Sequence, residues 1–227
     1  MTVWRHEVAT RLAAAGDPER AEGQQRYMKS AMPYHGVPMA EVRRIAKAVI
    51  RDHPFSSRDE WEATVLEIWR GATHREQRYA ATEIAIVRAH HPWFDGDALP
   101  MIEEMIVTGA WWDHVDALAA NHVGLMLRQD HARLAPAMWR WATDDDIWRR
   151  RTSILCQLKF KADTDLELLT HAIEASMGST EFFLRKAIGW ALRQYAYVDA
   201  DWVLAYVERH VDELSGLSKR EALKNIA

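Results

Sequence analysis

The chain has 227 residues, of which 48% are hydrophobic and 27% charged, a balance typical of a globular protein and not of a disordered one. No apolar run approaches the roughly eighteen residues that a membrane span needs, and charges interrupt the N-terminal segment, so we expect neither a transmembrane helix nor a signal peptide. The net charge of −4 lacks the overall basic character of many nucleic-acid-binding proteins. The single cysteine, Cys156, excludes internal disulfides, and we expect a cytoplasmic protein.

Apolar residues recur at spacings of three and four along almost the whole chain, which predicts helix after helix and no strand. Ser57, Thr73 and Ser218 each precede such a segment and each has a glutamate shortly after it, as expected of residues that begin helices. We therefore expect an all-α protein with helices that start at these three positions.

From residue 57 onward the predicted helices come in pairs. Their first helices begin near residues 57, 97, 130, 163 and 199, and this spacing of roughly 33 to 40 residues is typical of helical-repeat proteins. We expect one domain, a curved stack of antiparallel helix pairs whose second helices line a concave surface. In this interpretation residues 1–56 form an N-terminal helical cap, and residues 57–227 form the repeats.

Two charged residues occupy apolar faces of predicted helices. In the helix near 111 to 127, Asp116 lies among apolar residues, one turn after Trp112. In the helix near 147 to 161, Arg151 interrupts an apolar stripe where packing favours a leucine.

A third helix, near 182 to 197, carries Trp190 as the bulkiest residue of its apolar stripe. Asp116, Arg151 and Trp190 are each about one helix pair apart, so a repeat fold brings them to one face. Two interpretations stay open: a buried Asp116–Arg151 ion pair that ties two repeats together, with the tryptophans as core, or a carboxylate between aromatic walls that forms a site.

Five segments resemble, in order, the motifs of the AlkD-type DNA glycosylases, and the resemblance runs from about residue 20 to the end of the chain. These segments are YMKSAMPYHGVPMAEVR (27–43), WWDHVD (111–116), DDDIWRRRTSILCQLKFK (144–161), EFFLRKAIGWALRQYA (181–196) and LSKREALKNIA (217–227). The resemblance implies a HEAT-like helical-repeat solenoid that grips duplex DNA in a positively charged concave cleft. It also implies excision of bases such as 3-methyladenine and 7-methylguanine.

The resemblance also assigns roles to individual residues. Asp116 resembles the catalytic aspartate, Trp112 and Trp190 resemble the aromatic walls around the lesion nucleotide, and Arg151 resembles an arginine that contacts the DNA backbone. The N-terminal motif and the local basic clusters are expected to supply further DNA contacts. These expected contacts come from Tyr27, Lys29, Arg150, Lys159, Lys161, Lys186, Arg193, Lys219 and Arg220.

The chemistry of such a reaction suits an aspartate. An alkylated purine is already cationic and leaves readily, while positive charge develops on the deoxyribose, and a carboxylate stabilises that charge and orients a water. Aromatic faces attract the same charge. According to the resemblance, the reaction needs no pocket for a flipped base.

The expected partner is duplex DNA that contains alkylated purines, and we expect a monomer that is nucleoid-associated when bound to DNA. The sequence has no P-loop, dinucleotide-binding motif or metal-ligand spacing, so we expect no cofactor and no metal. Asp113 lies near a helix start, where its negative charge interacts favourably with the helix dipole, so we expect it to act as a cap. Cys156 is expected to be an inert, packed residue. Two alternatives stay open: a non-catalytic helical-repeat DNA-binding or scaffold protein, and a relative directed at bulkier lesions.

Overall fold

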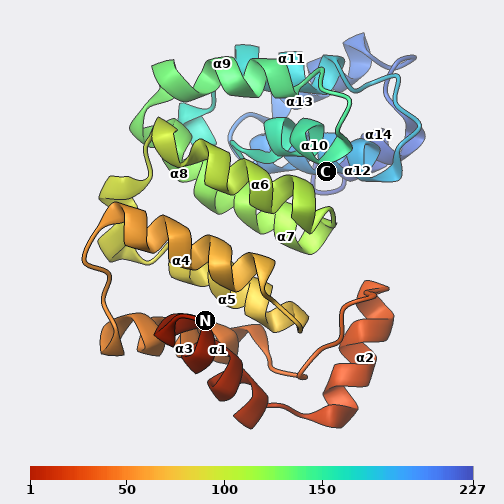
Figure 1. Cartoon of the computed structure of the whole chain (residues 1–227). Coiled ribbons are helices and arrows are strands. Elements are labelled where there is room, and N and C mark those ends of the chain that lie inside the picture. Colours follow the sequence, from red (N-terminus) through yellow and green to blue (C-terminus); the bar gives the residue numbers. More distant parts are fainter. Residues whose placement is uncertain (227) are drawn as a thin grey trace. The chain divides into compact units, whose positions relative to one another are not determined.

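A computed structural model describes residues 1–226, and these residues form helices and connecting turns without a strand (Figure 1). This confirms the predicted all-α class. The chain divides into two compact units, Met1–Trp93 and a second unit from Phe94 onward. Within the described residues, no helix combines the length and the apolar character that crossing a membrane requires.

The first unit consists of five α-helices and a closing 3₁₀ segment. Helices α1, α3, α4 and α5 pack against one another around buried residues such as Leu12, Val42 and Trp61. The bounds are α1 (Val3–Ala14), α2 (Pro18–Met28), α3 (Met39–Asp52), α4 (Arg58–Arg70), α5 (Arg75–Ala85) and η1 (Arg88–Trp93).

The predicted N-terminal cap is not helical throughout, because an irregular segment separates α2 from α3. The buried carboxylate of Glu76 accepts hydrogen bonds from the backbone N–H groups of His35, Gly36 and Val37, at 3.0, 2.8 and 3.1 Å. Gly36 has a φ of 84°, a conformation that favours glycine. One buried acidic side chain thus fixes the shape of this segment.

The second unit continues the pattern of helix pairs. Its first helices are α6, α9, α11 and α13, and its second helices are the run from α7 to α8, then α10, α12 and α14. The bounds are η2 (Gly96–Ala98), α6 (Leu99–Gly109), α7 (Trp112–Ala117), η3 (Leu118–Val123), α8 (Gly124–Gln129), α9 (His131–Trp141), α10 (Ile147–Leu155), η4 (Lys161–Asp163), α11 (Leu166–Glu174), α12 (Phe182–Ala196), α13 (Ala200–Arg209) and α14 (Gly216–Ala222). These first helices start within about three residues of the predicted positions.

The second helices of neighbouring pairs are in contact. The η3 segment packs on α10, α10 on α12, and α12 on α14. Apolar side chains from these helices, including Ile154, Ala187 and Ala222, belong to one buried cluster. Residues on successive second helices therefore face one another, as the repeat spacing predicts.

All three predicted helices are present, but only Ser57 of the three predicted residues is the N-cap of its helix. Ser57 caps α4 and accepts a hydrogen bond from a backbone N–H, as expected. The second helix begins one residue later than predicted, with His74 and not Thr73 at its N-cap. The last helix begins three residues earlier, because Ser215 provides the cap and leaves Ser218 buried inside α14.

The predicted helix near 111 to 127 is continuous but contains a π-helical turn, η3. The imidazole Nδ1 of His122 lies 3.4 Å from the carbonyl oxygen of Ala117, close to where the α-helical hydrogen-bond pattern changes. Gly124 follows the turn, and a Cβ there would lie 2.7 Å from the carbonyl oxygen of Cys156. Glycine therefore permits close packing of this helix on the chain that leaves α10.

Candidate active site

Asp116 and Arg151 form a two-point ion pair between neighbouring second helices. The Nε of Arg151 donates to Oδ1 of Asp116 at 2.7 Å, and its Nη2 donates to Oδ2 at 2.9 Å. The side chain of Arg151 is 4% exposed and that of Asp116 is 15% exposed. The Nη1 of Arg151 also donates to the carbonyl oxygen of Phe183, at the start of α12. One arginine thus links three successive repeats.

An aromatic cluster lies beside this arginine. The rings of Trp111, Trp148 and Phe183 have centroids 5.1 to 6.3 Å apart. The guanidinium carbon of Arg151 lies 5.9 Å from the centre of the Phe183 ring. Close packing and three hydrogen bonds leave the guanidinium little freedom, so the orientation of the Asp116 carboxylate is fixed as well.

The carboxylate of Asp116 borders a cavity of about 430 Å³. Each carboxylate oxygen that accepts one hydrogen bond from Arg151 keeps further acceptor capacity. The cavity combines an acid, an indole, an ammonium group and two side-chain amides. Its lining consists of Asp116, Ala117, Ala120, Asn121, Leu158, Lys159, Trp190 and Gln194.

Burial raises the pKa of Asp116 above its ordinary value, and the hydrogen bonds and charge of Arg151 oppose this rise without cancelling it. Nearby Asp113 raises it further. Ionising this group therefore costs more free energy than ionising a surface aspartate. Such a group is suited to stabilise a cation that forms beside it.

A family model described as DNA alkylation repair enzyme matches residues 8–226. The chain belongs to this family. No curated protein matches the sequence.

Solved structures resemble this chain to different degrees. A predicted DNA alkylation repair enzyme from Enterococcus faecalis is 28% identical, with a TM-score of 0.84, and the match covers 93% of this chain and 97% of that one. The Pseudomonas fluorescens alkylpurine DNA glycosylase AlkC, bound to DNA containing an abasic site analog, is 14% identical with a TM-score of 0.48. That match covers 98% of this chain and 62% of AlkC.

The structure of this chain brings some of the predicted site residues together. Asp116 on α7, Trp190 on α12 and Lys159 after α10 line one cavity, and Arg151 supports it from α10. Trp112 is the first residue of α7, one turn before Asp116, and is partly buried without lining this cavity. Trp112, Asp116, Arg151 and Trp190 nevertheless all lie on the adjoining second helices α7, α10 and α12.

Several of the predicted DNA contacts are already engaged by protein groups. Arg150 donates to the carbonyl oxygen of Ala175 at 2.9 Å. Lys186 and Arg193 both pair with Glu221, at 2.7 and 2.6 Å.

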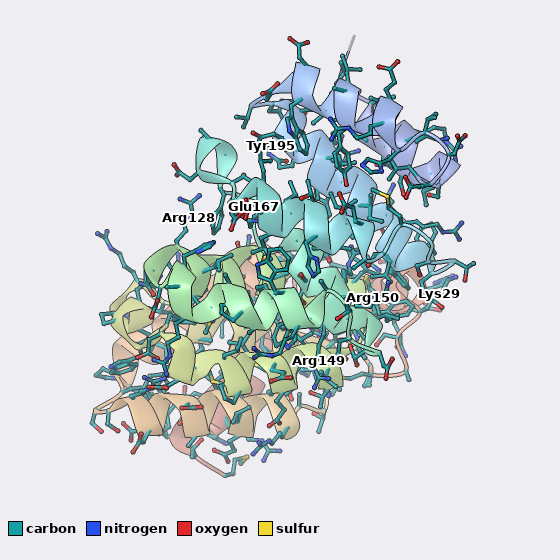
Figure 2. The ribbon with its side chains drawn as sticks, turned by 90° about the horizontal axis from the view of Figure 1, so that it is seen from above. Lys29, Arg128, Arg149, Arg150, Glu167 and Tyr195 are labelled. Carbon is teal, nitrogen blue, oxygen red and sulfur yellow. The ribbon has the colours of Figure 1, made fainter. Side chains whose placement is uncertain are left out.

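Basic residues lie near both ends of α10. Arg149 and Arg150 lie near the start of α10, whereas Arg128, which touches the segment after α10, lies on the opposite side of the view (Figure 2). Lys161 is exposed in η4.

The other predicted DNA contacts lie at the ends of the chain. On α14, Lys219 donates to the carbonyl oxygen of Val211 at 2.6 Å, and Arg220 is exposed. Tyr27 and Lys29, at the end of α2, belong to the first unit and are exposed.

Asn121 and Gln194 line the cavity but were not predicted as site residues. Gln194 follows Trp190 by four residues on α12, so helical spacing alone could have found it. Asn121 follows Asp116 by five residues, which in an α-helix places it well away from the aspartate. Asn121 lies in the π-helical turn η3 and lines the cavity together with Ala117, four residues before it.

Cys156 is fully buried at the end of α10, and its thiol donates to the carbonyl oxygen of Ser153 at 3.3 Å. Burial raises the pKa of this thiol to about 12, so the reactive thiolate is disfavoured. Across residues 1–226, no group of three histidine, cysteine or acidic side chains is arranged to hold a metal ion.

Proposed function

We propose that this alkylation repair enzyme is a DNA glycosylase. It hydrolyses the N-glycosidic bond of cationic alkylated purines, such as 3-methyladenine and 7-methylguanine, in duplex DNA. The observation that carries the proposal is the carboxylate of Asp116, fixed by Arg151 at the edge of a cavity that also contains the indole of Trp190. Membership in the DNA alkylation repair enzyme family supports it.

The positive charge of the alkylated base makes it a good leaving group, so the enzyme acts on the sugar. As the glycosidic bond lengthens, positive charge develops on the deoxyribose. The carboxylate of Asp116 stabilises this charge through the lone pairs that do not accept hydrogen bonds from Arg151. A water held by the same carboxylate then attacks the anomeric carbon. Trp190 contributes cation–π attraction of about 0.5 to 2 kcal/mol, which grows as the charge reaches the sugar.

Two further residues complete the proposed site. Trp112, one turn from Asp116 on α7 and outside the cavity lining, provides the second aromatic wall where the DNA extends beyond the cavity. Arg151 acts chiefly by orienting Asp116, and a contact with the DNA backbone would use the guanidinium N–H groups that its protein hydrogen bonds leave over. Because Asp116 and the two tryptophans act on the nucleotide's sugar, the mechanism requires no pocket that encloses a flipped base.

The test is release of free 7-methylguanine from a duplex that contains this lesion, measured under single-turnover conditions. We expect Asp116→Asn to slow release about 10²- to 10³-fold, because the amide cannot offset the developing positive charge. Binding to the duplex should change only a few-fold. Asp113→Asn is the matched control, since it removes a carboxylate from the same helix outside the cavity lining, and it should keep most of the activity.

Two outcomes would contradict the proposal. If Asp116→Asn releases the base at the wild-type rate, Asp116 has no part in the mechanism. If the wild-type protein binds the duplex but releases no base, the protein is a non-catalytic helical-repeat DNA-binding protein.

A further inference from the structure

The cavity beside Asp116 contains a side-chain pair that the proposed mechanism does not use. The ammonium group of Lys159 donates a hydrogen bond to Oδ1 of Asn121, and both residues line the cavity. We propose that Asn121 is a positioning residue that holds Lys159 in place for the phosphate next to the lesion nucleotide. This inference rests on the proposed function and adds a residue to it.

Asn121 lies in the π-helical turn η3, and it lines the cavity together with Ala117 and Ala120. In an α-helix, residues five apart point in directions that differ by about 140°. In a π-helical turn the backbone hydrogen bonds join residues i and i+5, which brings such residues closer to one face. The turn η3 begins two residues after Asp116 and includes Asn121. The turn therefore carries an amide side chain that lines the same cavity as Asp116.

The same helix also fixes the backbone that carries Lys159. Arg128, on α8, donates to the carbonyl oxygen of Lys159 at 2.6 Å, and its guanidinium carbon lies 4.4 Å from the centre of the Phe160 ring. Gly124 allows the carbonyl of Cys156 to approach closely. An exposed lysine is normally free to sample many rotamers, whereas this one is held at both its backbone and its ammonium group.

Charge determines what the held ammonium can bind. A cation beside the sugar opposes formation of the positively charged transition state, so its favourable partner is the anionic phosphate and not the sugar. Lys159 and Asp116 line one cavity, yet no ion pair joins them in the described structure. Because Asn121 accepts the hydrogen bond from the Lys159 ammonium, the remaining acceptor positions of Asp116 stay available to the sugar. Asn121 also lowers the rotamer entropy that Lys159 loses when DNA binds.

A double-mutant cycle tests the inference, with the dissociation constant for a duplex that carries a tetrahydrofuran abasic-site analogue as the readout. We expect Asn121→Ala to weaken binding about three- to tenfold when Lys159 is present, because the lysine must then be ordered by the DNA. In a Lys159→Ala background the same change should weaken binding less than about twofold. Alanine is the best helix former, so the variant should fold, and thermal melting verifies this.

Lys161 supplies the matched control, because it is another exposed lysine of the same segment that makes no hydrogen bond to Asn121. Asn121→Ala should weaken binding equally with and without Lys161. Equal weakening with and without Lys159, or no weakening at all, overturns the positioning role. Base release by the wild-type protein is measured in parallel: its absence contradicts the proposed function, whereas normal release with an additive cycle contradicts only the role of Asn121.

Discussion

At the residue scale, the ion pair between Asp116 and Arg151 is not explained by stability alone. Burying two charges costs desolvation energy that their attraction often fails to recover, and well-packed apolar residues can serve as well or better. The raised pKa of Asp116 shows that burial outweighs the arginine for this carboxylate. A costly pair that still borders a cavity is typical of a functional site.

The raised pKa of Asp116 predicts opposite pH dependences of activity and stability. The proposed mechanism requires the carboxylate, so the rate of excision should fall as pH decreases through a pKa above that of an ordinary aspartate. Because the folded state binds this proton more tightly than the unfolded state, the group's contribution to stability is present below the unfolded pKa and is lost as pH rises through the folded one.

The measurements are single-turnover excision against pH, corrected for spontaneous base loss, and the pH dependence of the difference in unfolding free energy between wild type and Asp116→Asn. Wild type should gain stability relative to the variant as pH falls. An excision profile that falls only near the pKa of an unperturbed aspartate would argue against this assignment.

Arg151→Met should destabilise the second unit, slow excision and weaken DNA binding. Removing one partner of a buried pair leaves an uncompensated charge, and the cost is about 3 kcal/mol, which denaturant unfolding measures. The acid limb of the excision profile should also move to higher pH, since Arg151 lowers the pKa of Asp116. Arg149→Met is the control: its ion pairs with Glu103 and Asp144 are partly exposed, so the change should cost less than about 1 kcal/mol. Equal losses for the two variants would count against a special role for Arg151.

At the element scale, the spacing of the helices predicted which residues meet, whereas the local sequence signals for helix starts were less reliable. The pairing of Asp116 with Arg151 followed from their separation by about one helix pair, because apolar periodicity defines which helices stack. The start at Ser218 was wrong because the buried serine bonds to the carbonyl oxygen of Arg185 on α12, a tertiary contact that sequence cannot show. Neither the π-helical turn nor the place of Asn121 in the cavity was predicted, since the sequence LAANHV is typical of an ordinary α-helix.

Gly189 tests the packing of α12 on α14. A Cβ at this position would lie 2.5 Å from the Cβ of Glu221 and 2.8 Å from the carbonyl oxygen of Ser218. We expect Gly189→Ala to destabilise the protein by about 1 to 2 kcal/mol, because overpacking exceeds the gain in helix propensity. Thermal melting measures the loss. Gly178→Ala, where the new Cβ meets no atom within 4 Å, should melt near the wild-type temperature; an equal drop would show that crowding at α14 is not the cause.

At the scale of the whole molecule, an enzyme with a net charge of −4 is proposed to bind a polyanion. The net charge is a poor guide to the number of basic side chains that DNA could contact, because some of these side chains are paired with acids and others are exposed. Hydrogen bonding to Lys186 lowers the pKa of Glu221, which keeps that acid ionised and the lysine occupied. Lys161, by contrast, is exposed. The number of phosphate contacts should therefore be smaller than the number of predicted basic residues.

The salt dependence of DNA binding measures this number. The logarithm of the association constant should fall linearly with the logarithm of salt concentration, by about 0.9 per neutralised phosphate. Lys161→Ala should reduce the slope by about one unit, and Lys186→Ala by clearly less, because its ammonium group is bound to Glu221. Binding that does not depend on salt would contradict phosphate contacts altogether, and equal slope changes would show that DNA displaces Glu221.

The single cysteine offers a native probe of how this molecule opens. Cys156 is buried directly after the helix that carries Arg151, and its thiol has a pKa of about 12. A thiol reagent should therefore modify the protein only when the end of α10 separates from its neighbours, so the labelling rate reports that opening without an introduced label. If DNA clamps the adjoining second helices, labelling should slow on binding, and the degree of slowing gives the free energy by which the complex tightens the site.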